Sequence, residues 1–237
     1  MNNSTIRHFD LAPDLSATLA ECMDNYDVGD PDADWPNNII SRRAVVYSSG
    51  VIARAGEPVR HNVEPDELAL CTRLAEEVCA LMSGVEVGMG SEAGDSFRRF
   101  FVAANAGDLI PDRIDGALIQ SKFGDTIFPL ATVTVEPLEE NGIWWSEVAN
   151  ETIEFDEFDK KEKYLRPWRA LIKWFQEQPA FKDTAFVRIG DWNALHDLDE
   201  NQWPEGTEIV PCVLPRLALG LTAHGSLVGL FGFSVQT

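Results

Sequence analysis

The sequence has few basic residues, and they are unevenly placed. Lys and Arg number 19 among 237 residues, against 39 Asp and Glu, so the formal net charge is −20. None lies between Arg7 and Arg42, a stretch that contains eight carboxylates. A field of this sign repels phosphate backbones and anionic lipid head groups. The composition therefore argues against direct binding of nucleic acid and favours a basic protein as the partner.

Charged side chains are absent altogether from the stretch after Arg216 through Thr237. About 20 uncharged residues are enough to span a bilayer. This stretch, however, contains four glycines and divides around His224-Gly225, which is typical of two strands joined by a tight turn. We therefore predict a C-terminal β-hairpin and no membrane span. The hairpin is expected at the centre of a sheet or against a partner, in a complex or a homo-oligomer, and a membrane-directed protein acting through it is the second alternative.

Cysteine is scarce, and no two cysteines form a C-x-x-C pair. Four cysteines in a chain of this length are typical of small buried side chains in a reducing compartment. The first ten residues contain no apolar run of the kind found in a signal peptide. We therefore expect a soluble cytoplasmic protein without a cofactor.

The periodicity of apolar residues predicts one α+β domain over residues 1–237. Two helices are clear, from Glu64 to Met82 and from Lys161 to Gln178, and others are expected over 13–23 and from Asp95. Strands are predicted over 39–48, 51–54, 114–123, 126–136, 184–189, 209–214, 217–223 and 227–235. Because these strands do not alternate regularly with helices, we expect an antiparallel or mixed sheet packed against three to four helices.

Two acidic loops, near 24–38 and 191–208, contain three of the seven tryptophans. Tryptophan in a loop suits an interface anchor, although it can also fold back onto the core. The leading hypothesis is a non-enzymatic interaction protein, of inhibitor, immunity or regulatory type, that binds a basic partner through these loops. The predicted partner-binding residues are Asp24, Asp27, Asp30, Asp32, Asp34, Trp35, Trp192, Asp197, Asp199 and Trp203.

The alternative hypothesis is a metal-assisted hydrolase. Asp191, His196 and Asp197 offer ligand atoms for a metal and groups for acid–base chemistry, but their spacing matches no closed ligand set. The run Asp30-x-Asp32-x-Asp34 offers hard oxygens for calcium, yet it lacks the glycine and glutamate of an EF-hand loop. The simpler interpretation is a solvated acidic loop in each case, so we expect no catalytic residues.

Basic residues concentrate on the helix predicted from Lys161. Arg166, Arg169 and Lys173 lie opposite its apolar stripe and could bind an anion. The favoured interpretation is that this face pairs with acidic residues of the preceding segment 151–159. The glycines between Gly88 and Gly94 lack the spacing of a phosphate-binding loop and are interpreted as a flexible turn.

Overall fold

The computed structural model describes residues 35, 39–41, 44–46, 52–54, 62–89, 93–94, 96–123, 126–153, 155, 157–205, 207 and 209–236. The helix predicted over 13–23 lies outside them. So do the five aspartates predicted in the first acidic loop.

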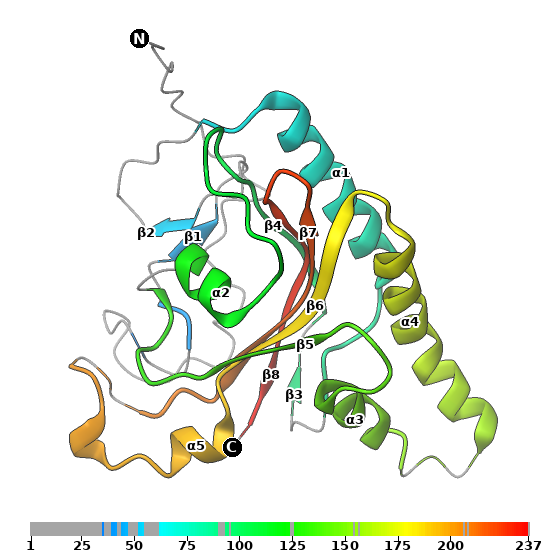
Figure 1. Ribbon diagram of the computed structural model, residues 1–237. Helices are drawn as coiled ribbons and strands as arrows, with labels where there is room; N and C mark the ends of the chain where they lie inside the picture. Colours follow the sequence, from blue (N-terminus) through cyan, green and yellow to red (C-terminus); the bar gives the residue numbers. More distant parts are fainter. Residues whose placement is uncertain are drawn as a thin grey trace.

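An antiparallel sheet of six strands forms the centre of the molecule (Figure 1). Its order is β3-β8-β7-β6-β5, and β4 pairs with β8 along the same edge as β3. The strands are β3 (Ala93–Gly94), β4 (Arg98–Val102), β5 (Val133–Pro137), β6 (Phe181–Ile189), β7 (Val213–Thr222) and β8 (Leu227–Val235). Separately, β1 (Ala44–Val46) and β2 (Ile52–Arg54) pair antiparallel, each within one of the predicted strands.

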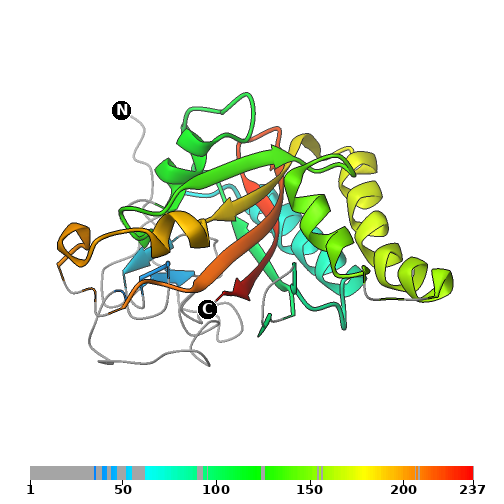
Figure 2. The same cartoon turned by 90° about the horizontal axis from the view of Figure 1, so that it is seen from below.

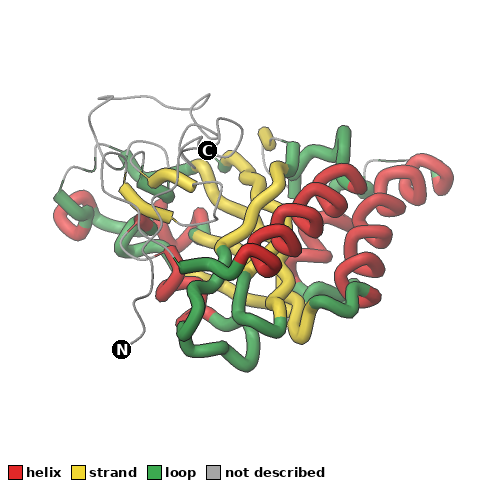
Figure 3. Tube along the Cα trace, turned by 90° about the horizontal axis from the view of Figure 1, so that it is seen from above, coloured by secondary structure: helices red, strands yellow, loops and turns green. Residues whose placement is uncertain are grey.

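Helices cover both faces of the sheet, as the perpendicular views show (Figures 2 and 3). On one face lie α1 (Pro65–Leu81), α3 (Ile143–Asn150) and α4 (Phe158–Glu177). Residues of α2 (Gly116–Phe123) and α5 (Trp192–His196) join the core on the other face, together with Ile39 and Ile40. The α+β class, the antiparallel sheet and the C-terminal hairpin are therefore confirmed, with five helices among the described residues instead of three or four.

The C-terminal hairpin lies in the middle of the sheet. Every residue of β7 and β8 is buried, because β6 flanks one side, β3 and β4 flank the other, and helices cover both faces. Successive side chains point to opposite faces, so Leu217 and Leu219 belong to the core on the α2 side, whereas Ala218 belongs to the core on the side of α3 and α4. The expected complex or homo-oligomer through this hairpin is thus corrected: its apolar surface is the protein's own core. No described helix is long and apolar enough to cross a membrane.

The two clearest predicted helices are present because their signals act locally. Pro65 starts α1, and Asp66 and Glu67 follow in its first turn, where acidic side chains complement the helix dipole. Gly84, with φ of 79°, ends the turn after the helix. In α4, the apolar stripe packs on the sheet and is buried at Leu165, Trp168, Ile172 and Phe175.

Three local predictions are wrong. The strand predicted over 114–123 is α2, whose start is stabilised by the Asp115 carboxylate accepting from the Leu118 N–H at 2.9 Å. The helix predicted from Asp95 is the strand β4. The two strands predicted over 209–214 and 217–223 form the single strand β7. Residues from Ile143 form α3, and the Glu136 carboxylate accepts the Ile143 N–H at 2.7 Å.

Candidate functional site

The connection between β6 and β7 carries an exposed acidic surface. We define this acidic rim as five exposed carboxylates with two half-buried tryptophans: Asp191, Asp197, Asp199, Glu200 and Glu205 with Trp192 and Trp203. No Lys or Arg occurs between Arg188 and Arg216. None of the five carboxylates forms a salt bridge with a basic side chain in the described part of the chain. The five carboxylates are exposed, and among them Asp191 acts on a described cation, since its charge raises the pKa of the buried Arg216.

Hydrogen bonds give the second acidic loop, near 191–208, a defined structure. The Asp191 carboxylate caps α5 by accepting from the Ala194 N–H at 3.0 Å. Asp199 and Gln202 form a capping box on a short 3₁₀ helix, Glu200–Gln202. Asp191 and Asp199 thus order the backbone, and the carboxylates of the rim are presented from fixed positions.

The three predicted tryptophan anchors differ in burial. Trp192 packs partly on the core, and its ring centroid lies 5.4 Å from that of His196. Trp203 is half-buried, and its indole N–H has no hydrogen-bond partner among the described residues. Trp35 is only 6% exposed and packs edge-on against Phe128 at 5.6 Å. Trp35 is therefore corrected to a core residue, because its ring is enclosed and leaves little surface for a partner.

One described residue of the first acidic loop, Trp35, contacts the second acidic loop. The first loop's predicted partner-binding residues Asp24, Asp27, Asp30, Asp32 and Asp34 lie outside the described residues. Trp35, which follows Asp34 in the chain, forms a parallel β-bridge with Thr207. The two acidic stretches of the sequence therefore meet at this bridge.

The residues considered for a metal are arranged around α5. Asp191 precedes the helix and caps it, whereas His196 is its last residue and Asp197 follows. Within the described residues, no group of three or more His, Cys, Asp or Glu side chains is placed to hold a metal ion. The capping bond gives the Asp191 carboxylate a structural role in this arrangement.

The basic face of α4 pairs partly with nearby acids. Arg169 lies 3.1 Å from Glu140 and 2.8 Å from Glu162, which raise the pKa of its guanidinium, and it stacks near the Trp145 ring. Lys173 pairs with Glu177 at 3.8 Å. Of the candidate anion-binding residues, Arg166 alone has no salt bridge to a described residue, and it is exposed. The partners of Arg169 and Lys173 come from α4 and from the segment before α3, whereas Lys160 at the start of α4 pairs with Glu157 of the acidic segment 151–159 at 3.2 Å.

A charge cluster around the buried Arg216 lies beneath α3, and no local pattern in the sequence predicts it. Arg188 on β6 contacts Glu136 at 3.0 Å and Glu147 of α3 at 2.8 Å. Beside it, Arg216 on β7 is only 4% exposed and donates to the Pro215 carbonyl at 3.0 Å, but its Nε atom has no partner among the described residues. Burial lowers the pKa of Arg216 to about 10, while the charge of Glu147 opposes this shift. The same burial raises the pKa of Glu147.

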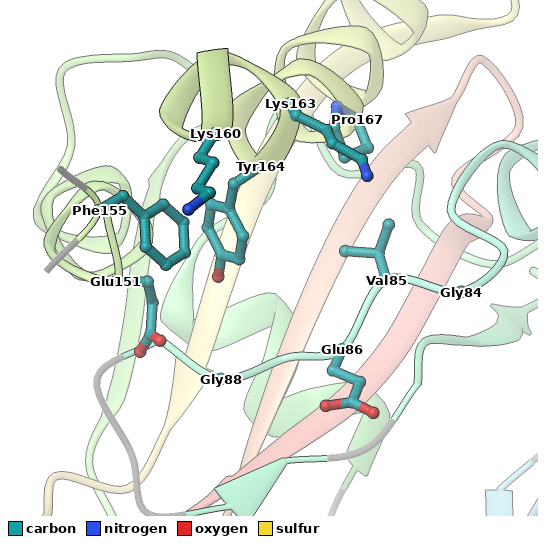
Figure 4. A pocket seen from close by; sticks show the side chains of 10 residues that line it. All are labelled: Gly84, Val85, Glu86, Gly88, Glu151, Phe155, Lys160, Lys163, Tyr164 and Pro167. Atoms are coloured by element: carbon teal, nitrogen blue, oxygen red, sulfur yellow. The ribbon is translucent and has the colours of Figure 1, made fainter. Parts of the chain in front are cut away.

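A cavity of about 500 Å³ opens between α4, the α3–α4 connection and residues 84–88 (Figure 4). Such a volume is typical of small-molecule sites. Tyr164 of α4 lines it, and burial, aided by the charge of Glu151, raises the pKa of this phenol to about 12. The hydroxyl therefore remains a hydrogen-bond donor at neutral pH.

A buried polar network ties α1 to the turn of the C-terminal hairpin. The Thr222 hydroxyl donates to the Glu67 carboxylate at 2.6 Å and accepts from the Ser226 N–H at 3.0 Å. The Ser226 hydroxyl oxygen accepts from the Ala104 N–H at 3.0 Å. Cys71 is fully buried beside this network, with its sulfur 3.8 Å from Glu67. The network is enclosed, which favours a structural role over a nucleophilic one.

Cys71 is expected to resist alkylation until the protein unfolds. Burial raises the pKa of its thiol from 9.0 to about 12, which lowers the thiolate fraction at pH 8 roughly a thousandfold. Iodoacetamide labelling followed by peptide mapping should modify the half-buried Cys79 and Cys212 first, and all at similar rates in urea. Between pH 9 and about 12, the Cys71 thiol keeps its proton in the folded state but loses it in the unfolded state. The contribution of Cys71 to stability is therefore fully present below pH 9 and is lost as the pH rises toward 12. Rapid labelling of native Cys71 would contradict this.

No protein-family model matches the chain, and no curated protein matches it in sequence. The chemistry of the described residues therefore carries the functional interpretation.

Proposed function

We propose that the protein is a non-enzymatic interaction protein, of inhibitor, immunity or regulatory type, that binds a basic protein through the acidic rim. One observation carries the proposal: five exposed carboxylates share a segment without Lys or Arg, and no described cation pairs with them. Elsewhere on the described surface, carboxylates are commonly paired, as in the contact of Arg169 with Glu162. A basic partner would supply the missing counter-charges.

Charge and apolar surface would act at different stages of binding. The exposed carboxylates would speed encounter with a positive surface, because long-range attraction acts mainly on the association rate. Trp192 and Trp203 would add contact area, since half-buried tryptophans bury more surface with little loss of side-chain freedom. A cytoplasmic location is part of this proposal and is consistent with the unpaired thiols of Cys71, Cys79 and Cys212.

Neutralising the rim is expected to weaken partner binding about tenfold. The change is a triple variant, Asp197→Asn, Glu200→Gln and Glu205→Gln, which spares the capping carboxylates Asp191 and Asp199. Three exposed charges worth about 0.5 kcal/mol each account for this factor. The measurement is affinity capture from a native lysate, identification of the retained protein, and titration of the purified pair at about 50 and 200 mM salt.

A matched control changes the net charge equally at other exposed sites. Glu64→Gln, Asp112→Asn and Glu139→Gln remove three carboxylates outside the rim. This control should bind within about twofold of the unchanged protein, since distant exposed charges are largely screened. Equal weakening by both triple variants, or a retained partner that is itself acidic and insensitive to salt, would contradict the proposal.

A further inference from the structure

The cavity beside α4 has one aromatic wall and one aliphatic wall. Phe155 and Tyr164 form the first, with ring centroids 5.8 Å apart at an interplanar angle of 75°. Val85 extends into the cavity from the opposite side, and Pro167 lines it from α4 beside Lys163 (Figure 4). A flat apolar group placed between these walls would be removed from water on both of its faces.

Two ammonium groups enter the cavity from α4. Lys160 and Lys163 lie on successive positions of the same helix face, and both side chains reach the cavity (Figure 4). Lys160 is 3.2 Å from Glu157, whereas Lys163 forms no ion pair within the described residues. This edge of the cavity therefore favours an anionic group.

The opposite edge carries negative charge. Glu86 and Glu151 line the cavity from the segment after α1 and from the end of α3, on the side away from α4 (Figure 4). Gly88 lies between them, and a Cβ atom there would come within 3.4 Å of the Glu151 carboxyl carbon. This is an ordinary van der Waals distance, so the Glu151 carboxylate lies directly against the backbone at Gly88. Because the two signs of charge are separated across the cavity, a purely anionic or purely cationic ligand would meet repulsion at one edge.

We propose that this cavity binds a short zwitterionic peptide with an aromatic side chain. Its carboxylate would lie against Lys160 and Lys163, its ammonium group against Glu86 and Glu151, and its ring between Tyr164 and Val85. The Tyr164 hydroxyl supplies a donor for a peptide carbonyl. The site does not depend on the acidic rim, which other elements form.

The test uses phenylalanyl-alanine and two capped forms, the N-acetyl peptide and the C-terminal amide. Calorimetry should show saturable binding of the free dipeptide, with each cap weakening it about tenfold. Lys163→Met should weaken the free dipeptide about tenfold and leave the amide unaffected, because the amide lacks the carboxylate that Lys163 binds. Glu86→Gln should likewise weaken the free dipeptide and leave the N-acetyl form unaffected.

The matched control is Lys173→Met, which removes an exposed lysine on α4 outside the cavity. Lys173→Met should bind the free dipeptide as the unchanged protein does. The triple rim variant should also bind it normally, so failure of this proposal is distinct from failure of the proposed function. Absence of saturation at about 10 mM dipeptide, equal affinity for free and capped forms, or equal weakening by Lys173→Met would overturn the assignment. Because Glu86, Lys163 and Lys173 are exposed, the variants should keep the melting temperature of the unchanged protein.

Discussion

Replacing Gly229 with alanine is expected to lower the free energy of unfolding by about 3 kcal/mol or more. Gly229 lies in β8, between Leu219 of β7 and Phe100 of β4. A Cβ atom there would come 1.9 Å from the carbonyl oxygen of Ala218 and 3.1 Å from the Phe175 ring. The closer atom belongs to the backbone of a central strand, so a side-chain rotation cannot relieve the clash, and the two central strands must separate.

Urea unfolding measures this effect, with a loss of roughly 10 °C in melting temperature expected for a chain of this size. Gly116→Ala is the control. The nearest atom to a Cβ at Gly116 is 3.8 Å away, and the residue begins α2, where alanine is the better helix former. The control should be neutral or slightly stabilising. Similar stability of the Gly229→Ala protein would show that β7 and β8 are less closely paired than described.

Replacing Glu147 with glutamine is expected to cost about 3 kcal/mol, because it removes the acid that most strongly offsets the burial of the Arg216 charge. Glu147 binds Arg188 at 2.8 Å and also opposes the burial of Arg216. Arg188 and Arg216 are direct neighbours across β6 and β7, so removing the carboxylate also increases the repulsion between them. Without Glu147, the carboxylate of Glu136 is the acid that remains in contact with Arg188 among the described residues.

A double-mutant cycle separates this electrostatic effect from lost packing. Arg216→Met alone should cost about 1 kcal/mol, because Glu147 keeps its contact with Arg188. In the Glu147→Gln protein, the same methionine should restore about 2 kcal/mol, since it removes the unpaired charge. Urea unfolding of all four proteins gives the coupling energy. Additive losses would show that Glu147 stabilises the fold without interacting with Arg216.

The sequence predicts the class of fold and its most regular elements. The apolar stripe of α4 and the proline and acids at the start of α1 act within one segment, so they can be recognised without tertiary contacts. The turn at His224-Gly225 likewise defines the hairpin, in which Gly225 has φ of 91°. Burial of both faces of that hairpin follows from its lack of charge.

Short apolar segments are ambiguous, and this accounts for the wrong predictions. Phe97, Phe100 and Phe101 have helical spacing, yet in β4 the latter two point to opposite faces of a sheet that is buried on both sides. Ile114, Leu118 and Ile119 fit one face of a helix as well as a buried strand. Tertiary packing decides between the two structures in such segments.

The candidate sites were predictable only where they lie within one segment. The acidic rim comes from a single stretch of sequence, so its lack of Lys and Arg can be seen directly. The burial of Trp35, however, depends on Phe128, which lies far along the chain. The cavity and the charge cluster likewise join distant residues, such as Glu86 with Lys163 and Glu147 with Arg188.

The place of β8 in the sheet constrains how the protein is made. The strands synthesised early, β3 and β4, pair with β8 and with no other described strand. Until residues 227–235 have left the ribosome, β3 and β4 have no strand to pair with, and β7 lacks its neighbour on that side of the sheet. The earlier strands must therefore wait for β8 with their apolar side chains exposed, so the six-stranded sheet can assemble only after β8 has been synthesised, and its earlier strands are open to capture by chaperones until then.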